Sequence, residues 1–365
     1  MLLSSVHFRN YATFDDLELA FRQGMNVLFG VNGTGKTTIL RALADVLHAL
    51  PSPKARKAML QPSLQKAGSS DCQVTATLEG ASGSCIVHCS ERGIHATQDD
   101  GSQDKDAMPQ GPRIVSILSG KRDIHFARLK TRFARLESQE QHERQRDSTY
   151  RDPILERIRA SIAEIAPGLQ NLHIKKERVG HPLCVEKNGM ILDVASELSA
   201  GENFLVGLLA HIALELDTAS RANQDMIVLL DNPEASLHPL WQMQLCPLLK
   251  KTFPKVQFIL ASLSPFMWAS LDRREIVWLD YNEKGKVAQK RVSFARGASI
   301  ENILASFFQV PGAVDEAASE VHIIETLIEQ GNAMEAQKAI EALRERFGEI
   351  PVLAMLDFRL QLLNN

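Results

Sequence analysis

The sequence predicts an α/β fold: a largely parallel β-sheet with helices, interrupted by a helical insertion and extended by C-terminal helices. Apolar runs of strand length occur at 25–30, 226–230 and 256–261, and strands that are apolar throughout are typical of parallel sheets covered on both faces. Segments with helical periodicity separate these runs. A chain of 365 residues that is 44% hydrophobic has enough apolar side chains for one large core or two smaller ones.

Composition excludes some classes of protein. Lys and Arg total 41 against 44 Asp and Glu, a net charge of −3, so the chain as a whole is not built to hold nucleic acid by charge. The five cysteines form no CxxC pair, which favours a reducing compartment without a disulfide framework, and we expect a cytoplasmic protein. No stretch approaches the roughly 18 apolar residues of a membrane span, so we expect no membrane association.

Four segments follow from the patterning. We expect an N-terminal lobe at 1–120, a helical arm at 121–174, a C-terminal lobe at 175–295 and a helical extension at 296–365. Residues 121–159 contain eleven Lys or Arg and seven Asp or Glu, with spaced apolar residues. This pattern is typical of a solvated helical insertion laced with ion pairs, and the alternative is an arm that binds nucleic acid or a partner protein.

A glycine-rich segment, Gly30-Val31-Asn32-Gly33-Thr34-Gly35-Lys36-Thr37, fits the phosphate-loop pattern between a buried strand and a helix. Glycines allow backbone N–H groups to surround phosphates, a lysine adds a charge on the outer phosphates, and a hydroxyl can ligate Mg²⁺. The segment therefore predicts binding of ATP with Mg²⁺. The expected nucleotide contacts are Asn32, Gly33, Thr34, Gly35, Lys36, Thr37 and Thr38.

The apolar run at 226–230 ends in Asp231. Such a strand delivers a carboxylate to the edge of a parallel sheet, as a Walker B strand does. We expect Asp231 and the Thr37 hydroxyl to hold the Mg²⁺ together.

A third motif is Leu198-Ser199-Ala200-Gly201-Glu202, which precedes a helical run. Taken alone, the motif could be an ordinary helix cap. Following the phosphate loop and preceding the Walker B strand, it resembles the LSGGQ signature of ABC-type ATPases, and we expect Ser199, Gly201 and Glu202 to contact nucleotide. The segment 235–239 then has the position of the D-loop.

The sequence more closely resembles the soluble ABC ATPases related to SMC, RecF and OLD-type proteins. The resemblance spans most of residues 1–295 and rests on Phe8–Tyr11, Asn32-Gly33, Leu237–Gln242 and Ser264–Phe266. The C-terminal helices are similar to those of ATPase subunits from Septu and retron anti-phage systems. The resemblance implies an ABC-ATPase head whose homodimer sandwiches ATP between the phosphate loop of one copy and the signature of the other. It also implies a partner effector, a nuclease or toxin of the same system.

Two positions depart from the family. The catalytic glutamate that follows the Walker B aspartate is replaced by Asn232, an amide that orients water but accepts no proton. Glu234 replaces it only if the turn brings its carboxylate within about 3 Å of the water, so Asn232 and Glu234 are the two candidate catalytic residues. The switch histidine is replaced by Leu263, which cannot donate to a phosphate. The Q-loop has no certain place, and Lys121 or Arg122 are candidates for it.

These departures leave hydrolysis of ATP an open question and favour a slow or non-hydrolysing switch that controls an effector. The alternative is an active ATPase stimulated by DNA, with Arg128, Lys130, Arg132 and Arg135 as its DNA contacts. A pseudo-ATPase without nucleotide is a third reading, which intact Lys36 and Thr37 disfavour.

Overall fold

The computed structural model describes residues 1–50, 72–80, 83–90, 93–98, 111–118, 124, 126–176, 181–307, 316–348 and 351–363. They form two compact units, Met1–Ile300 and Glu301–Asn365. The Q-loop candidates Lys121 and Arg122 lie outside the described residues. In the described part of the chain, no helix is both long enough and apolar enough to cross a membrane.

The first unit contains a six-stranded sheet in the order β14-β13-β3-β12-β11-β7. Its strands are β3 (Met25–Gly30), β7 (Arg113–Ile117), β11 (Met226–Asp231), β12 (Val256–Ala261), β13 (Ile276–Tyr281) and β14 (Val287–Lys290). All neighbours are parallel except β14, which pairs antiparallel with β13. Every residue of β3, β11 and β12 is buried, which explains why these strands are apolar almost throughout and confirms the predicted fold class.

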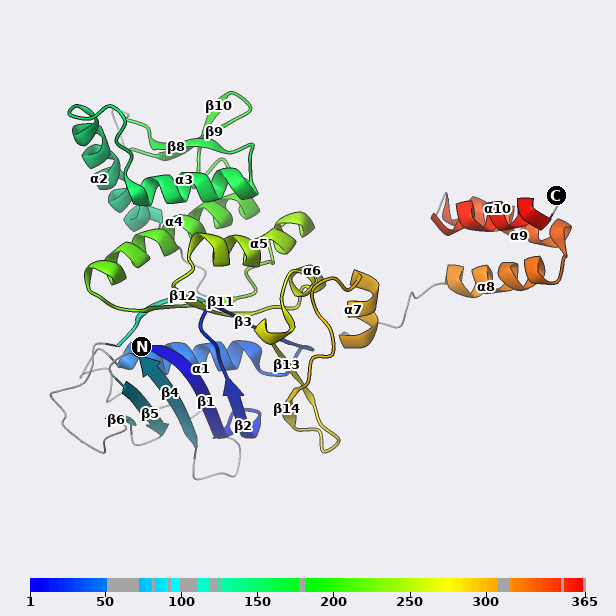
Figure 1. Cartoon of the computed structure of the whole chain (residues 1–365), viewed down its shortest axis with the longest axis horizontal. Helices are drawn as coiled ribbons and strands as arrows, with labels where there is room; N and C mark the ends of the chain where they lie inside the picture. Colours follow the sequence, from blue (N-terminus) through cyan, green and yellow to red (C-terminus); the bar gives the residue numbers. More distant parts are fainter. Residues whose placement is uncertain are drawn as a thin grey trace. The chain divides into compact units, whose positions relative to one another are not determined.

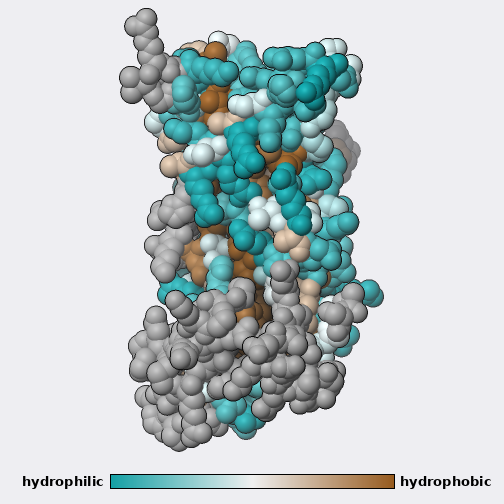
Figure 2. All heavy atoms as spheres, turned by 90° about the vertical axis from the view of Figure 1, so that its left-hand side faces the viewer, coloured by the Kyte–Doolittle hydropathy of each residue, from teal (hydrophilic) through white to brown (hydrophobic). Residues whose placement is uncertain are grey.

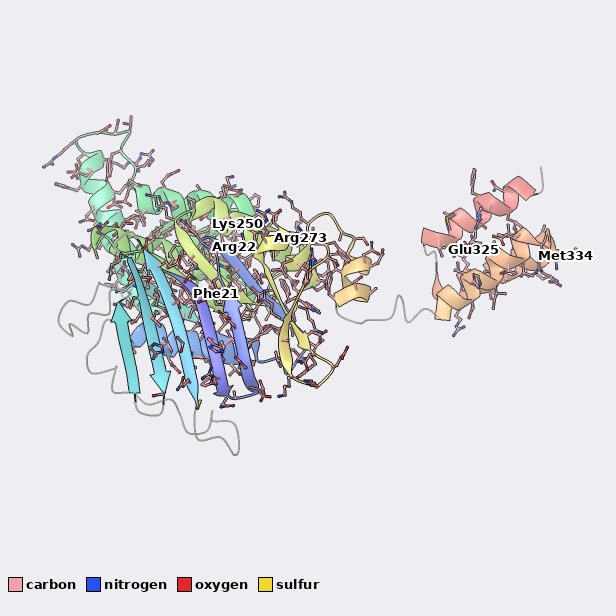
Figure 3. The ribbon with its side chains drawn as sticks, turned by 60° about the horizontal axis from the view of Figure 1, so that its bottom comes forward. Phe21, Arg22, Lys250, Arg273, Glu325 and Met334 are labelled. Atoms are coloured by element: carbon pink, nitrogen blue, oxygen red, sulfur yellow. The ribbon has the colours of Figure 1, made fainter. Side chains whose placement is uncertain are left out.

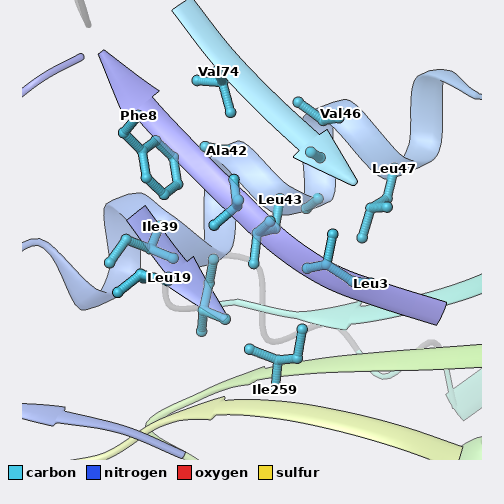
Figure 4. Close-up of a cluster of buried hydrophobic side chains, with 14 of the residues drawn as sticks. Leu3, Phe8, Leu19, Ile39, Ala42, Leu43, Val46, Leu47, Val74 and Ile259 are labelled. Carbon is cyan, nitrogen blue, oxygen red and sulfur yellow. The ribbon is translucent and has the colours of Figure 1, made fainter. Parts of the chain in front are cut away.

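A second, antiparallel sheet has the order β2-β1-β4-β5-β6. Its strands are β1 (Leu2–Tyr11), β2 (Phe14–Ala20), β4 (Gln73–Gly80), β5 (Gly83–Ser90) and β6 (Gly93–Gln98). Helix α1 (Lys36–Ala49) lies between the two sheets. Figure 4 shows its apolar side chains, such as Leu43 and Val46, in one cluster with Phe8 of β1 and Ile259 of β12. This shared core fixes the helix that begins in the phosphate loop.

Helices cover the other face of the parallel sheet (Figure 1). They are α2 (Phe126–Arg144), α3 (Pro153–Ile165), α4 (Ala200–Arg221), α5 (Pro239–Thr252) and α6 (Pro265–Ala269), with the short helix η3 (Arg273–Glu275) before β13. Helices α2 and α3 both pack against α4. Leu129 and Phe133 of α2 are fully or nearly buried. The part of the predicted arm that forms α2 therefore packs one of its faces into this helical layer.

A small antiparallel sheet, β10-β9-β8, belongs to the same layer. Its strands are β8 (Gln170–Ile174), β9 (Leu183–Lys187) and β10 (Met190–Asp193). Strand β8 lies inside the segment 121–174 that we expected to be helical throughout. It forms because its backbone pairs with β9 and because the Ile174 N–H donates to the Glu137 carboxylate of α2 at 3.0 Å.

The second unit contains the helices α8 (Glu316–Glu329), α9 (Ala333–Phe347) and α10 (Pro351–Leu363). Helix α7 (Ile300–Phe307) precedes them and begins at the last residue of the first unit. An apolar core that includes Ile324, Ile340 and Leu356 holds α8, α9 and α10 together. An ion pair of 2.6 Å joins Arg344 of α9 to Asp357 of α10. Helices α7 to α10 all lie in the segment 296–365 that we expected to form a helical extension.

Candidate nucleotide-binding site

The phosphate loop connects β3 to α1 at the carboxyl end of the parallel sheet. Its lysine folds back over the loop: the Lys36 ammonium donates to the carbonyl oxygens of Gly30 at 2.6 Å and Val31 at 3.1 Å. Burial lowers the pKa of Lys36, and the charges of Asp231 and Glu234 oppose this shift. Lys36 therefore already lies in the loop that phosphates would occupy.

Glycine is required where the loop enters α1. Gly35 is the N-cap of α1 with φ 82°, a left-handed conformation, and no side chain caps the helix. A Cβ at Gly35 would lie 2.4 Å from the Phe14 ring, closer than any real contact. The N–H groups of an uncapped first helical turn are free to bind an anion, and the helix dipole favours one there.

Two residues far apart in the sequence meet beside the loop. The Thr37 hydroxyl lies 3.1 Å and 3.0 Å from the two carboxylate oxygens of Asp231, which is 3% exposed. A hydroxyl and a carboxylate in contact are the protein ligands that Mg²⁺ uses when phosphates and water complete its octahedron. This donor set fits the ion expected from the sequence.

The signature forms the start of α4. Ser199 is its N-cap, in a reciprocal capping box with Glu202. The Glu202 carboxylate also pairs with Lys187 of β9 at 2.8 Å. Burial acts to raise the pKa of Glu202, but hydrogen bonds from Lys187 and Ser199 outweigh it and hold the pKa below its usual value. Glu202 is thus engaged within its own chain, whereas the neighbouring N–H groups of the helix start can face an anion.

Gly201 is the point where the signature touches the segment after β11. A Cβ at Gly201 would lie 2.3 Å from the Ser236 carbonyl oxygen, so only glycine permits this approach. Among the described residues, no hydrogen bond joins Ser199 or Gly201 to the phosphate loop of the same chain.

Asn232, the residue after Asp231, has a left-handed backbone conformation. Its φ is 48°, a value that asparagine adopts more readily than most residues. Its N–H donates to the Ala261 carbonyl oxygen of β12 at 2.9 Å. The amide side chain provides hydrogen bonds at this position but no base.

Glu234 is buried and already bonded on one side. Its Oε1 accepts the Ser262 hydroxyl at 2.7 Å and the Leu263 N–H at 3.0 Å. Its Oε2 is buried and has no hydrogen-bond partner among the described residues. Burial raises the pKa of Glu234, the charge of Asp231 adds to the rise, and the bonds from Leu263 and Ser262 oppose it.

The loop after β12 is held through a chain of hydrogen bonds. The Ser264 N–H donates to the Ser262 hydroxyl oxygen at 3.0 Å, and the Ser264 hydroxyl donates to Gln242 Oε1 at 2.5 Å. Ser264 also caps α6. His238 caps α5 by accepting the Leu240 N–H. Leu263, which we expected in place of a switch histidine, has its own N–H bonded to Glu234 Oε1.

The structure brings together the phosphate loop, Lys36, Thr37, Asp231 and Glu234. The signature residues Ser199 and Gly201 are not part of this group, since no hydrogen bond joins them to the phosphate loop of the same chain among the described residues. The resemblance included Gln242 but did not predict its contacts: its Nε2 donates to the Leu237 carbonyl oxygen at 2.8 Å while its Oε1 accepts from Ser264. A glutamine one turn into a helix carries no signal of its own, since its role depends on a contact 22 residues away.

Comparisons with known proteins agree with this geometry. Residues 5–178 match the model of an AAA domain, AAA_23. The retron Ec83 probable ATPase of Escherichia coli is 34% identical over 161 residues, which is 43% of this chain and 28% of that protein. The Septu protein PtuA of Bacillus mycoides is 30% identical over 114 residues, 31% of this chain and 16% of that protein. The chain thus matches less than a third of the length of these relatives.

Solved structures show the same fold. An SMC head bound to the C-terminal winged-helix domain of ScpA superposes with a TM-score of 0.54 at 19% identity, covering 80% of this chain and 98% of that one. A second SMC head, with an extended coiled coil and bound to the C-terminal domain of ScpA derived from Pyrococcus furiosus, gives 0.53 at 14% identity, covering 85% and 99%. The chain has the fold of an SMC-type ABC-ATPase head and resembles the retron Ec83 probable ATPase and the Septu protein PtuA.

Proposed function

Because the chain has the fold of an SMC-type ATPase head, we propose that it is an ATP-dependent switch of an anti-phage defence system. In this proposal, two copies sandwich ATP and Mg²⁺, hydrolyse the nucleotide slowly or not at all, and control a partner effector while they remain paired. ATP then acts chiefly as the ligand that stabilises the dimer.

One observation carries the proposal: the parts that bind nucleotide are intact while the parts that activate water are not. Lys36, Thr37 and Asp231 meet in one site. Asn232 replaces the catalytic carboxylate, and Glu234 is held by Ser262 and Leu263. Losing a positioned base typically costs about 10²–10⁴ in rate, so binding without rapid turnover is the expected outcome.

Dimerisation is supported by the placement of the signature. The start of α4 has N–H groups suited to a phosphate, yet no hydrogen bond links it to the phosphate loop of its own chain among the described residues. A second copy would bring its signature to the open side of the nucleotide. The close contact of Gly201 with Ser236 would then connect ATP binding to the segment that follows Asp231.

The proposal of an effector partner rests on the resemblance to a retron probable ATPase and to the Septu protein PtuA. The helices of the C-terminal unit also expose large apolar side chains. Met334 is 74% exposed and Phe358 is 61% exposed, and Figure 3 shows Met334 at the surface of this unit. Exposed apolar groups of this size are common where a protein contacts another.

The test is ATP turnover by the purified protein with Mg²⁺, measured together with its mass in solution with and without ATP. We expect negligible hydrolysis and a doubling of mass with ATP, which the Lys36→Ala variant should lack. Hydrolysis at ordinary ABC-ATPase rates would contradict the switch, and stimulation of that rate by DNA would favour the active-ATPase alternative. A Lys36→Ala variant that assembles normally would mean that nucleotide has no role in assembly.

A further inference from the structure

A strongly basic groove lies along α2 and the C-terminal half of α4, away from the phosphate loop. Its volume is about 470 Å³, and its charged lining is Arg113, Arg128, Arg132, Arg135, Arg221 and Asp217. Figure 2 shows hydrophilic side chains gathered on this face of the molecule. With the adjacent Glu215 included, five arginines face two carboxylates, so the groove has a local excess of positive charge. The charge is local, because the whole chain has a net charge of −3.

Two of the arginines are held in fixed positions. Glu215 of α4, 5% exposed, pairs with Arg113 at the start of β7 through distances of 2.8 and 2.5 Å, and with Arg132 of α2. Arg132 also donates to the Thr218 hydroxyl at 2.7 Å. One buried carboxylate thus fixes two guanidinium groups at the floor of the groove, and ordered groups lose less conformational entropy when they bind a ligand.

Two other arginines of the groove have no carboxylate partner among the described residues. Arg128 and Arg135 are exposed, and neither forms an ion pair or a hydrogen bond within the described part of the chain. With Arg132 they follow an i, i+4, i+7 spacing, which places all three on one face of α2 over about 10.5 Å. Arg221, on α4 across the groove, pairs with Asp217 at 3.0 Å. Gathering unpaired like charges is unfavourable unless an anion neutralises them.

We propose that this groove binds a run of phosphate groups, such as a single nucleic-acid strand or a free polyphosphate presents. All five cations are arginines, whose planar fork of N–H donors matches the oxygens of a phosphate better than a lysine ammonium does. Three arginines in a row about 10.5 Å long can contact several successive phosphates of one extended chain. The groove shares no residue with the ATP site, and the inference does not depend on the switch proposed above.

The test uses the full chain carrying Lys36→Ala, so that phosphates do not bind in the phosphate loop. Fluorescence anisotropy with a labelled single-stranded oligonucleotide measures affinity as a function of salt. Arg128→Glu with Arg135→Glu is the test variant, and Arg144→Glu with Arg157→Glu makes the same charge change at exposed arginines of α2 and α3 outside the groove. Circular dichroism checks that both double variants fold.

We expect the groove variant to weaken binding at least tenfold and the control to change it less than about twofold. For the neutral pair Arg128→Ala and Arg135→Ala, the slope of log affinity against log salt should fall by about 1.4, roughly 0.7 for each lost phosphate contact. Asp217→Asn should tighten binding, because it removes a repelling carboxylate and frees Arg221.

Competition by inorganic tripolyphosphate identifies the ligand. If it displaces the oligonucleotide, a free phosphate chain suffices; if the oligonucleotide binds and is not displaced, the groove requires a nucleic-acid strand. Either result supports the site. Absence of binding by both probes, or equal weakening by the groove and control variants, would overturn it.

Discussion

Replacing Glu234 by glutamine separates two roles that this residue can have. In the structure Glu234 is 7% exposed, its Oε1 accepts from Ser262 and Leu263, and burial raises its pKa. Glutamine keeps a carbonyl oxygen that can accept both bonds but cannot ionise. The Glu234→Gln variant therefore preserves the contacts of a positioning residue and removes the function of a base.

The pH dependence of stability follows from the direction of the pKa shift. A carboxyl group whose pKa is higher in the folded protein binds more protons when folded than when unfolded. Stability is then greatest below the ordinary pKa of the carboxyl group and falls as pH rises toward the folded pKa. The loss is about 1.4 kcal/mol for each pH unit by which the two pKa values differ. Glu234→Gln escapes this loss, although its new amide group can lack a buried partner at a cost of about 1–3 kcal/mol.

The difference in unfolding free energy between Glu234→Gln and the wild type should therefore shift in favour of the variant as pH rises from 4 to 8. Urea unfolding followed by tryptophan fluorescence measures it at each pH. Glu283→Gln, at an exposed carboxylate, is the control and should show almost no such trend. A difference that stays constant with pH would refute the assignment of Glu234 as a buried carboxyl with a raised pKa.

ATP turnover of the same variant tests the second role. If Glu234 only positions the loop of Leu263, Glu234→Gln should hydrolyse ATP at the low rate of the wild type. If Glu234 is the general base, the rate should fall by about 10²–10⁴. A fall of that size would show that the chain is a working ATPase and would remove the main support for the proposed switch.

Three other changes give separate tests. Asn232→Glu should raise ATP turnover at least tenfold, because it restores a base. It should also lower the free energy of unfolding by about 1 kcal/mol, because residue 232 has φ 48°, which glutamate adopts less readily than asparagine. Both quantities are measured on the purified variant. Gly201→Ala should weaken ATP-dependent dimers, seen by mass in solution, while one chain still binds nucleotide, because its Cβ would lie 2.3 Å from the Ser236 carbonyl. Glu215→Ala should destabilise the protein by about 3 kcal/mol or more in urea unfolding, since it leaves Arg113 and Arg132 without their buried partner.

The sequence was most informative where chemistry depends on neighbours along the chain. The phosphate loop needs its glycines, Lys36 and Thr37 in fixed order between a strand and a helix, and each of these is a local feature. The parallel sheet was predictable for a similar reason, because β3, β11 and β12 are buried on both faces and their residues are apolar at almost every position. The meeting of Thr37 with Asp231 then followed from the sheet.

Contacts between distant segments were beyond the reach of such patterns. Arg113 and Glu215 are 102 residues apart, and Glu234 and Ser262 are 28 apart. Each pair exists because packing brings two elements together, and nothing in the sequence around Glu234 or Glu215 names the partner that it bonds. Arg132, expected as a possible DNA contact, is likewise tied to Glu215, so neutralising it would change folding as well as any ligand binding.

The arrangement of three strands explains why Glu234 matters with or without hydrolysis. β12 lies between β3, which leads into the phosphate loop, and β11, which ends at Asp231. The loop after β12 therefore emerges between the two halves of the nucleotide site, and Glu234 bonds directly to it. If bound ATP moves Glu234, by repulsion from its phosphates or through a bound Mg²⁺ or water, the bonds to Ser262 and Leu263 must break or move with it. Ser264 links that loop to Gln242 of α5 and caps α6, so a movement of the loop would be passed to these two helices without a chemical step.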